Sequence, residues 1–473
     1  MAARRGLSEP SARAPTGRLR PMPHPDSTPL PLFVHASPDL PVAFTRDGIV
    51  NAHQFVADVH AFADRLPDAP HILNACGDRY LFAVGFGAAL LRGQRTLLPA
   101  NHAPATLERL ARSHPGLQAL TDALAPSLEL PALAVTREGD THVTPFEAPA
   151  IPGDRVAAVL FTSGSTGEPV PTVKSWALLA ASGRNEARAL ELGDLPALAI
   201  VGTVPPQHSY GLESTVLIAL QGGFAFDAGR PFFPADICAA LAVLPRPRML
   251  VTTPVHLRAL VASEDHPPEV DLLLSATAPL APQLAADAEQ RFGAPVKEIY
   301  GCSEAGQLAT RHLLAGAEWR LMGDIALRQD ERGTWASGGH VPGDILLADV
   351  IELVDRERFI LHGRTADLIN IAGKRTSLAH LDLQLNTVDG VRDGAFLMPD
   401  DAEDRVVRLA AFVVAPGRTA REILDALQER IDTAFLPRPL HLVDSLPRNA
   451  TGKIPREALL ALAEQLSKRR DVP

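Results

Sequence analysis

Short segments that are apolar throughout constrain the fold of this chain more than any other feature. Helix-like runs separate these segments, for example at residues 79–93 and 282–293. A strand that is apolar on both sides needs cover on both sides, which is the environment of a parallel sheet flanked by helices. We therefore predict an α/β fold, in which a large N-terminal domain has mostly parallel sheets packed by helices. The apolar segments are residues 71–76, 95–100, 117–121, 155–163, 198–204, 248–254 and 270–276.

The pattern changes after Leu368. A short helical run and two apolar strands lead to an amphipathic helix over 421–435, a strand over 441–447 and a last helix over 455–469. The formal charge of the chain is −10, but the part from Leu368 onward has 15 basic and 15 acidic residues. This length suits a separate α+β domain. The predicted divisions are a disordered tail (1–27), a large domain (28–361), a hinge (362–367) and a small mobile domain (368–473).

Composition excludes several classes of protein. The excess of 55 acidic over 45 basic residues argues against a nucleic-acid or anionic-membrane partner. The three cysteines include no CxxC pair, which argues against a disulfide framework and a cysteine zinc site. Apolar runs fall short of the roughly 18–20 residues that span a bilayer, and the Arg-rich start lacks the apolar core of a secretory signal. We expect a soluble cytoplasmic protein with no membrane span.

The segment Phe161-Thr-Ser-Gly-Ser-Thr-Gly-Glu-Pro169 follows an apolar strand directly. Backbone N–H groups and hydroxyls of such a loop can wrap phosphate oxygens. The spacing differs from that of a Walker A loop. On composition alone, an ordinary surface turn remains the alternative interpretation.

Four further motifs follow this loop in a definite order. Together the five resemble the adenylate-forming superfamily, which includes acyl-CoA synthetases, aryl-acid ligases, peptide-synthetase adenylation domains and luciferases. The resemblance runs from about residue 28 to the end of the chain. It implies that ATP and Mg²⁺ activate a carboxylic acid to an acyl-AMP, which then acylates a pantetheine thiol of CoA or an acyl carrier protein. The four motifs are Pro-Pro-Gln-His-Ser-Tyr-Gly-Leu (205–212), Ile-Tyr-Gly-Cys-Ser-Glu (299–304), Gly-Arg-Thr-Ala-Asp (363–367) and Leu-Pro-Arg-Asn-Ala-Thr-Gly-Lys-Ile-Pro-Arg (446–456).

The resemblance also implies roles for individual residues. Lys453 is expected to bridge the carboxylate and the α-phosphate, and His208 to line the acid pocket. Glu304 is expected to hold Mg²⁺, with Thr166 as a second candidate ligand. Asp349 lies fifteen positions before Arg364, as the ribose-binding aspartate of the family does, and its two oxygens suit two hydroxyls. The other implied binding residues are Thr162, Ser163, Gly164, Ser165 and Gly167 of the phosphate loop, Thr277, Ala278, Pro279 and Tyr300 around adenine, Gly301 and Ser303 beside them, Arg364 of the hinge motif, and Gly373 at the thiol tunnel.

Each of these residues has a plainer interpretation when it is taken singly. Tyr300 could be a core aromatic residue, His208 a hydrogen-bonded core histidine, and Lys453 a surface lysine. Glu213, next to the His208 motif, could be structural and paired with an arginine.

The chain also departs from the family pattern at three positions. Val170 stands where the phosphate loop usually continues with lysine, and the next lysine is Lys174. Ala366 replaces the usual hinge residue, and His380 stands where an acidic residue is usual. Ala366 is expected to bear on rate more than on capability, and the three departures together motivate the alternative of a catalytically impaired homologue.

The segments around Trp176 and His208 resemble the AMP-ligase branch of aryl-polyene (xanthomonadin-type) pigment pathways. That finer resemblance implies a hydroxybenzoate-like acid and an acyl carrier protein as acceptor. A medium-chain fatty-acyl ligase and a catalytically impaired nucleotide-binding homologue are the alternatives. A nicotinamide dehydrogenase is disfavoured because no GxGxxG fingerprint follows a strand.

Overall fold

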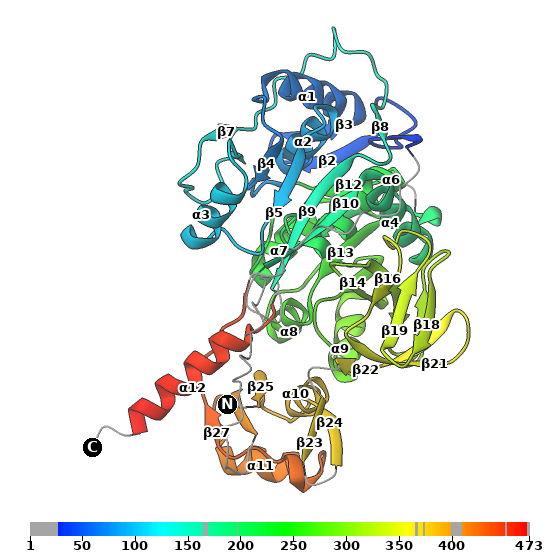
Figure 1. Cartoon of the computed structure of the whole chain (residues 1–473). Coiled ribbons are helices and arrows are strands. Elements are labelled where there is room, and N and C mark those ends of the chain that lie inside the picture. The colour runs from blue at the N-terminus through cyan, green and yellow to red at the C-terminus, as the bar shows by residue number, and fades with distance from the viewer. Residues whose placement is uncertain are drawn as a thin grey trace, which may run out of the picture.

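The computed structural model describes residues 27–163, 169–195, 197–364, 368–371, 374–398, 409–449 and 452–470. Figure 1 shows a large α/β body above a smaller C-terminal unit. Residues 1–26, most of the predicted tail, lie outside the described residues. Among the described helices, none combines the length and apolar character needed to cross a membrane.

The first sheet has six strands in the order β10-β9-β5-β4-β6-β7, parallel except for β10. The helix α2 (Arg79–Leu91) is apolar almost all round and is buried beside this sheet, and Asp78 caps its first turn by accepting the Leu81 N–H. The strands are β4 (His71–Asn74), β5 (Arg95–Leu98), β6 (Gln118–Thr121), β7 (Ala132–Ala134), β9 (Val156–Ser163) and β10 (Pro169–Ser175), with the helices α1 (Ala52–Arg65) and α3 (Pro104–Ser113).

The second sheet has eleven strands in the order β21-β22-β17-β16-β15-β14-β13-β11-β12-β2-β3. The run from β15 to β2 is parallel, whereas the strands on either side of it pair antiparallel. Its strands are β2 (Pro41–Thr45), β3 (Gly48–Asn51), β11 (Ala199–Gly202), β12 (Ala225–Asp227), β13 (Arg248–Thr252), β14 (Leu272–Ser275), β15 (Val296–Cys302), β16 (Gly306–His312), β17 (Trp319–Leu321), β21 (Asp349–Leu353) and β22 (Arg358–Arg364).

Helices and two small sheets complete the large body. The helical elements are α4 (Trp176–Ala189), η1 (Leu192–Asp194), α5 (Ser209–Gly211), the π-helical turn η2 (Leu212–Leu217), α6 (Ile218–Gly222), α7 (Pro234–Val243), α8 (Pro254–Ala262) and α9 (Pro282–Phe292). The small sheets are β1 (Pro29–Pro31) with β8 (Ala150–Pro152), and β18 (Ala326–Asp330) with β19 (Gly333–Ser337) and β20 (Ile345–Leu346). The α/β fold with mostly parallel sheets in the large domain is therefore confirmed.

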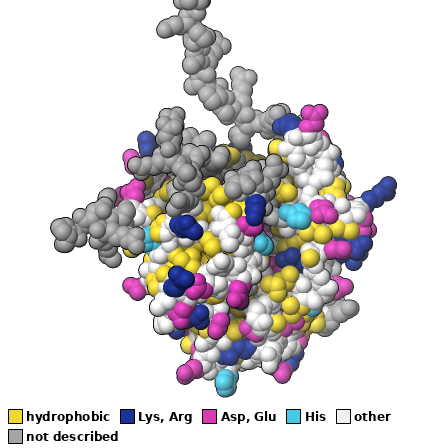
Figure 2. Space-filling view, turned by 90° about the horizontal axis from the view of Figure 1, so that it is seen from below, with side chains coloured by type: hydrophobic (Ala, Val, Ile, Leu, Met, Phe, Trp, Pro, Cys, Tyr) yellow, Lys and Arg dark blue, Asp and Glu magenta, His cyan; other side chains and the backbone are white. Residues whose placement is uncertain are grey.

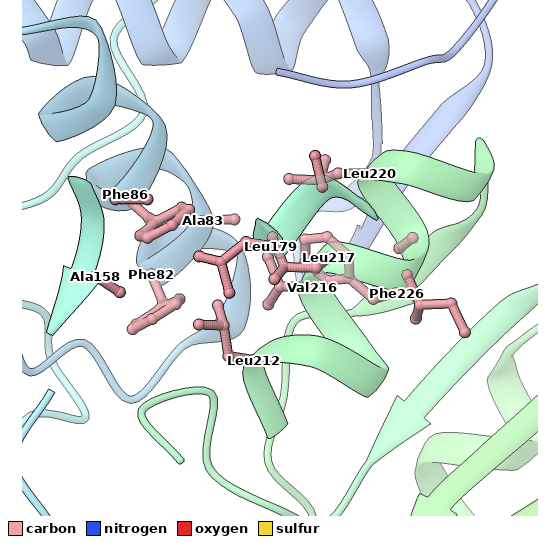
Figure 3. Packing of buried hydrophobic residues seen from close by; sticks show 14 of the residues in the cluster. Phe82, Ala83, Phe86, Ala158, Leu179, Leu212, Val216, Leu217, Leu220 and Phe226 are labelled. Atoms are coloured by element: carbon pink, nitrogen blue, oxygen red, sulfur yellow. The ribbon is translucent and has the colours of Figure 1, made fainter. Parts of the chain in front are cut away.

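The two large sheets share one hydrophobic core. Phe82 and Phe86 on α2 face Leu179 of α4 and Leu212 and Leu217 of η2 (Figure 3). This packing fixes the helices that lie between the two sheets.

Arg79 joins the same parts through its fully buried guanidinium. The group donates to the Thr215 side chain and to main-chain oxygens at the carboxyl ends of β11 and β12. These include the oxygens of Gly202 and Asp227, both at 2.9 Å. Burial lowers the pKa of this arginine to about 10. Five donors in a rigid fork allow one side chain to hold several carbonyls at once.

The C-terminal unit has its own core, built around Phe396, Phe412 and Phe435. Residues 365–367 of the predicted hinge lie outside the described residues, and β22 ends at Arg364. On the face seen from below, acidic and basic side chains are interspersed with apolar ones (Figure 2). The elements are β23 (Leu368–Ile371), β24 (Lys374–Ser377), α10 (Leu378–Asn386), β25 (Asp393–Leu397), β26 (Ala410–Val414), α11 (Ala420–Gln428), η4 (Thr433–Phe435), β27 (Leu440–Leu442) and α12 (Arg456–Arg470).

The helix predicted over 421–435 is too long. It starts one residue earlier, at a capping box of Thr419 and Glu422, but ends at Gln428. The Asp432 side chain accepts the Ala434 N–H and starts a short 3₁₀ turn instead. Aspartate often competes with helical hydrogen bonds in this way, and the apolar periodicity does not register it.

Candidate active site

Three of the predicted site segments lie beyond the carboxyl ends of neighbouring parallel strands. His208 follows β11, the Thr277 loop follows β14, and Tyr300 lies near the carboxyl end of β15. These strands, with β13 among them, are consecutive in the second sheet, so their ends meet at one edge. Ligands of open α/β sheets bind at this edge.

The predicted phosphate loop connects β9 to β10. The two strands pair antiparallel, and Ser163 lies opposite Pro169. The loop therefore sits at the tip of a hairpin, unlike a Walker A loop, which leads into a helix. Gly164, Ser165, Thr166 and Gly167 lie outside the described residues, as do the side chains of Thr162 and Ser163.

The Tyr300 hydroxyl donates a hydrogen bond of 2.8 Å to the Asp349 carboxylate. Asp349 begins β21 and lies opposite Arg364 on β22, so the fifteen-residue spacing corresponds to one antiparallel pair. The Tyr300 ring is only 8% exposed and packs against Trp319 and Phe359. The plainer interpretation of Tyr300 as a core aromatic therefore holds, while its contact with adenine stays a prediction.

The glycine of the Tyr-Gly motif has a structural reason. A Cβ on Gly301 would lie 2.3 Å from the carbonyl oxygen of Gly306 on the neighbouring strand β16. A β-bulge between Tyr300 and Gly301 brings the two backbones this close. Ser303 and Glu304 lie in the following turn and are half-buried.

Thr277 adopts a conformation that suits glycine. Its φ of +80° is in the left-handed region, where a β-branched side chain is strained. The family loop that it resembles has glycine at this position. Thr277 and Ala278 are half-buried and Pro279 is exposed, so the strained loop reaches the surface at the strand edge. Strain of this kind persists where the surrounding structure holds it.

His208 caps the short helix α5 with its ring, because Nδ1 accepts the Tyr210 N–H at 3.3 Å. Burial lowers the pKa of this histidine to about 4, and the nearby positive charge of Lys453 contributes to the shift. The imidazole is therefore neutral near pH 7 and can accept or donate hydrogen bonds without carrying charge. The Tyr210 hydroxyl ties the same turn to the main chain of β13 and β14.

Lys453 approaches this edge from the C-terminal unit. Gly452, the residue before it, lies against Thr253 and Val255 just after β13, and Lys453 is near enough for its charge to lower the pKa of His208. Gly452 has φ of +78°, and a Cβ there would meet the Val255 side chain at 3.2 Å. A bulkier residue at 452 would push the lysine loop away from α8.

A second contact connects the two units. Asp393 on β25 forms two hydrogen bonds with Arg448, of 2.6 and 2.8 Å, within the C-terminal unit. Arg258 on α8 reaches the same carboxylate from the large body at 3.4 Å. The C-terminal unit is thus held with Lys453 turned toward the strand edge.

Two charged residues near the site are buried, which the sequence did not indicate. Lys174 on β10 is 2% exposed and donates from Nζ to the main-chain oxygen of Glu304 at 3.0 Å. Glu213 is 1% exposed and accepts hydrogen bonds of 2.6 Å from Ser182 and from Ser209. The predicted pairing of Glu213 with an arginine is therefore wrong, because two serine hydroxyls serve its two oxygens. The only earlier signal was that Lys174 is the first lysine after Val170.

Glu186 on α4 is a third buried acid. Burial raises the pKa of its carboxyl to about 8, and the charge of Glu213 adds to the shift. Ser214 and Gln307 lie close enough to lower this pKa in part, but in the described part of the chain neither forms a hydrogen bond of normal geometry with the carboxyl. The group is thus largely protonated near pH 7.

The donor set fits a cation that takes few protein ligands. Among the described residues, no three His, Cys, Asp or Glu side chains gather to hold a metal. Mg²⁺ usually uses one or two carboxylates together with substrate phosphates and water. Glu304 is a half-buried carboxylate beside the phosphate-loop hairpin, so it suits that mode of binding. Its role as a ligand stays a prediction, as does the role of Gly373, which lies outside the described residues.

Comparison with known proteins identifies the family. The model of the AMP-binding enzyme family matches residues 64–356. The chain belongs to this family. The predictions of an adenylate-forming superfamily member and of an acid–thiol ligase type of enzyme are confirmed, whereas the aryl-polyene branch stays a prediction.

Individual relatives are distant. A 4-coumarate–CoA ligase from Rhodobacter capsulatus is 28% identical over 313 residues, which are 65% of this chain and 77% of the relative. A 3-hydroxybenzoate–CoA/4-hydroxybenzoate–CoA ligase from Thauera aromatica is 24% identical over 371 residues, 68% of this chain and 69% of the relative. The ATP-bound structure of MatB from Rhodopseudomonas palustris matches with a TM-score of 0.76 and 18% identity, over 92% of this chain and 98% of that one. At that identity the match concerns the fold.

Proposed function

We propose that this enzyme activates a carboxylic acid with ATP and transfers the acyl group to a pantetheine thiol. In the first step a carboxylate oxygen attacks the α-phosphorus, the bond to the β-phosphate oxygen breaks, and pyrophosphate leaves. In the second step a thiolate sulfur attacks the acyl carbonyl carbon, and AMP leaves with the bond electrons. The observation that supports this proposal is that the His208 segment, the Gly452–Lys453 loop and the Tyr300–Asp349 pair lie at the carboxyl ends of strands of the same parallel run, from β11 to β15.

Each residue has a role that its surroundings support. Asp349, oriented by the Tyr300 hydroxyl, would hold the two ribose hydroxyls. Lys453 would neutralise charge between the carboxylate and the α-phosphate. Neutral His208 would hydrogen-bond the acid at the entrance of its pocket. Mg²⁺, held by Glu304, would offset charge on the leaving pyrophosphate.

For the acid we propose a hydroxybenzoate-like aryl acid. Two observations support this choice: the resemblance around Trp176 and His208 to the aryl-polyene branch, and the aryl-acid substrates named for the relatives from Rhodobacter and Thauera. The same resemblance supports an acyl carrier protein as acceptor, with CoA as the alternative. The Gly373 loop would line the thiol tunnel after the small domain rotates about residues 362–367.

The test is ATP–pyrophosphate exchange with 3-hydroxybenzoate, 4-hydroxybenzoate and octanoate, followed by thioester formation with CoA and with a carrier protein. Faster exchange with either benzoate supports the proposed acid. Faster exchange with octanoate would favour the fatty-acyl alternative. Absence of exchange with every acid, although ATP still binds, would indicate an impaired nucleotide-binding homologue.

A further inference from the structure

Within the described part of the chain, Lys174 is a buried ammonium with no counterion in contact. Its side chain lies inside the large body at 2% exposure, opposite Ala158 of β9. Its hydrogen bond to the Glu304 main-chain oxygen uses one of three N–H donors. Among the described residues no carboxylate forms an ion pair with it. A buried charge in this state is costly unless something else completes its partners.

The neighbouring acids do not complete them. Burial lowers the pKa of Lys174, and the nearby groups Glu213, Cys302 and Glu304 raise it in part without forming an ion pair with the ammonium. Glu213 already accepts from two serines. Lys174 is hydrogen-bonded to the main chain of Glu304 and lies within electrostatic range of Glu213, so it is close to two predicted motifs. One is expected to bind the nucleotide and the other the acid.

We propose that Lys174 binds an anionic oxygen of the reacting groups, on the acid's carboxylate or on the α-phosphate that this carboxylate attacks. The proposal rests on the proposed function and adds a catalytic residue to it. β10 begins directly after the phosphate loop, so Lys174 is held by the same two strands, β9 and β10, that carry the loop. It supplies the charge that the chain lacks at Val170. Unlike Lys453, it belongs to the large body and does not leave when the small domain rotates.

Two variants separate anion binding from support of the Glu304 main chain. Lys174→Met keeps the length and apolar stem but removes the charge and the donors. Lys174→Gln removes the charge but keeps an N–H donor for the Glu304 oxygen. The matched control is Lys297→Met, because Lys297 also donates to a main-chain oxygen, that of Leu190 at 3.3 Å, outside the candidate site.

We expect both Lys174 variants to keep the parent melting temperature and to lose about 10²-fold in single-turnover acyl-AMP formation. Calorimetry with the acid alone and with ATP alone identifies the oxygen that is bound, because only the affinity for that ligand should fall. Both variants should also acylate the thiol more slowly when given chemically made acyl-AMP. The Lys297 control should match the parent in every assay.

Parent-like adenylation by Lys174→Met would overturn the inference. Activity retained in Lys174→Gln but lost in Lys174→Met would also overturn it, because the residue would then only support the main chain of Glu304. Neither result touches the proposed function, which fails instead if the parent enzyme forms no acyl-AMP with any acid.

Discussion

The contact between Arg258 and Asp393 allows a quantitative test of domain alternation. Arg258→Met removes the cross-unit ion pair but leaves Asp393 with its two hydrogen bonds from Arg448. No buried charge is therefore left without a partner, and the C-terminal unit should stay folded. The substitution acts on the relative position of the two units, which in the proposed mechanism decides which half-reaction can proceed.

The size of the effect follows from the geometry. The pair has one contact of 3.4 Å, and its side chains are 27% and 18% exposed. Such pairs contribute roughly 0.5–1 kcal/mol, and repulsion between Arg258 and Arg448 offsets part of this. A change of this size shifts the balance between two orientations by about 2–5-fold. The ratio of the thiol-transfer rate to the adenylation rate should rise by that factor.

Both rates can be measured separately. Single-turnover acyl-AMP formation gives the first rate, and thioester formation from chemically made acyl-AMP gives the second. Arg246→Met is the control, because Arg246 forms its ion pairs with Glu269 and Asp271 inside the large body. If Arg258→Met slows both steps equally, or leaves their ratio at the parent value, the contact does not hold the adenylating orientation.

Four further predictions address the site and the core. Lys453→Ala should reduce acyl-AMP formation by about 10²-fold but acylate the thiol from supplied acyl-AMP at the parent rate; equal losses in both steps would contradict this. Asp349→Ala should weaken ATP binding in calorimetry, because hydrogen bonds worth about 1.5–3 kcal/mol each are lost, while Tyr300→Phe should weaken it less; unchanged ATP affinity in Asp349→Ala would assign ribose to another residue. Glu186→Gln should reduce the decline of the unfolding free energy with pH between about pH 5 and 8. The carboxyl has a pKa of about 8 in the native state against 4.5 in the unfolded state, so its protonated form stabilises the parent at low pH, and the parent should lose about 1.4 kcal/mol per pH unit as the pH rises. An equal decline in both proteins would contradict this prediction. Thr277→Gly should leave the melting temperature close to that of the parent, because relief of about 1–2 kcal/mol of left-handed strain offsets both the chain entropy of glycine and the loss of the threonine's own contacts; a clearly lower melting temperature would contradict this.

Much of the large body could be predicted because buried parallel strands appear in a sequence as short segments that are apolar throughout. The apolar segments at 198–204, 248–254 and 270–276 became β11, β13 and β14, side by side in one sheet. The fifteen residues between Asp349 and Arg364 separate two residues that lie opposite each other on β21 and β22, a pairing that was not predicted from the sequence. The contacts that each motif makes with neighbouring strands could not be predicted from the sequence. The close approach of the β15 and β16 backbones, which requires glycine at 301, and the hydrogen bond from Tyr300 to Asp349 depend on the β-bulge between Tyr300 and Gly301. No local sequence pattern predicts this bulge.

The buried charged residues escaped sequence reasoning for a general reason. Lysine and glutamate usually mark exposed positions, so Lys174 on a strand and Glu186 on a helix are read as surface residues. Their burial is decided by elements that lie far away in sequence, such as the β15–β16 hairpin over Lys174 and η2 beside Glu186. A single sequence does not display those contacts.

The two lysines at the site differ in how they are held, and this difference has a mechanistic consequence. Lys453 is exposed on a loop of the C-terminal unit, and its position depends on contacts such as Gly452 with Val255 and Asp393 with Arg258. Lys174 is fixed inside the large body by β9 and β10. Negative charge has to be stabilised on the phosphate side in both half-reactions, as pyrophosphate leaves first and AMP leaves second. If the small domain rotates between the steps, Lys453 serves only the first, and the charge needed in the second has to come from a residue that stays. Lys174 meets that requirement, so its loss should slow both steps where loss of Lys453 slows one.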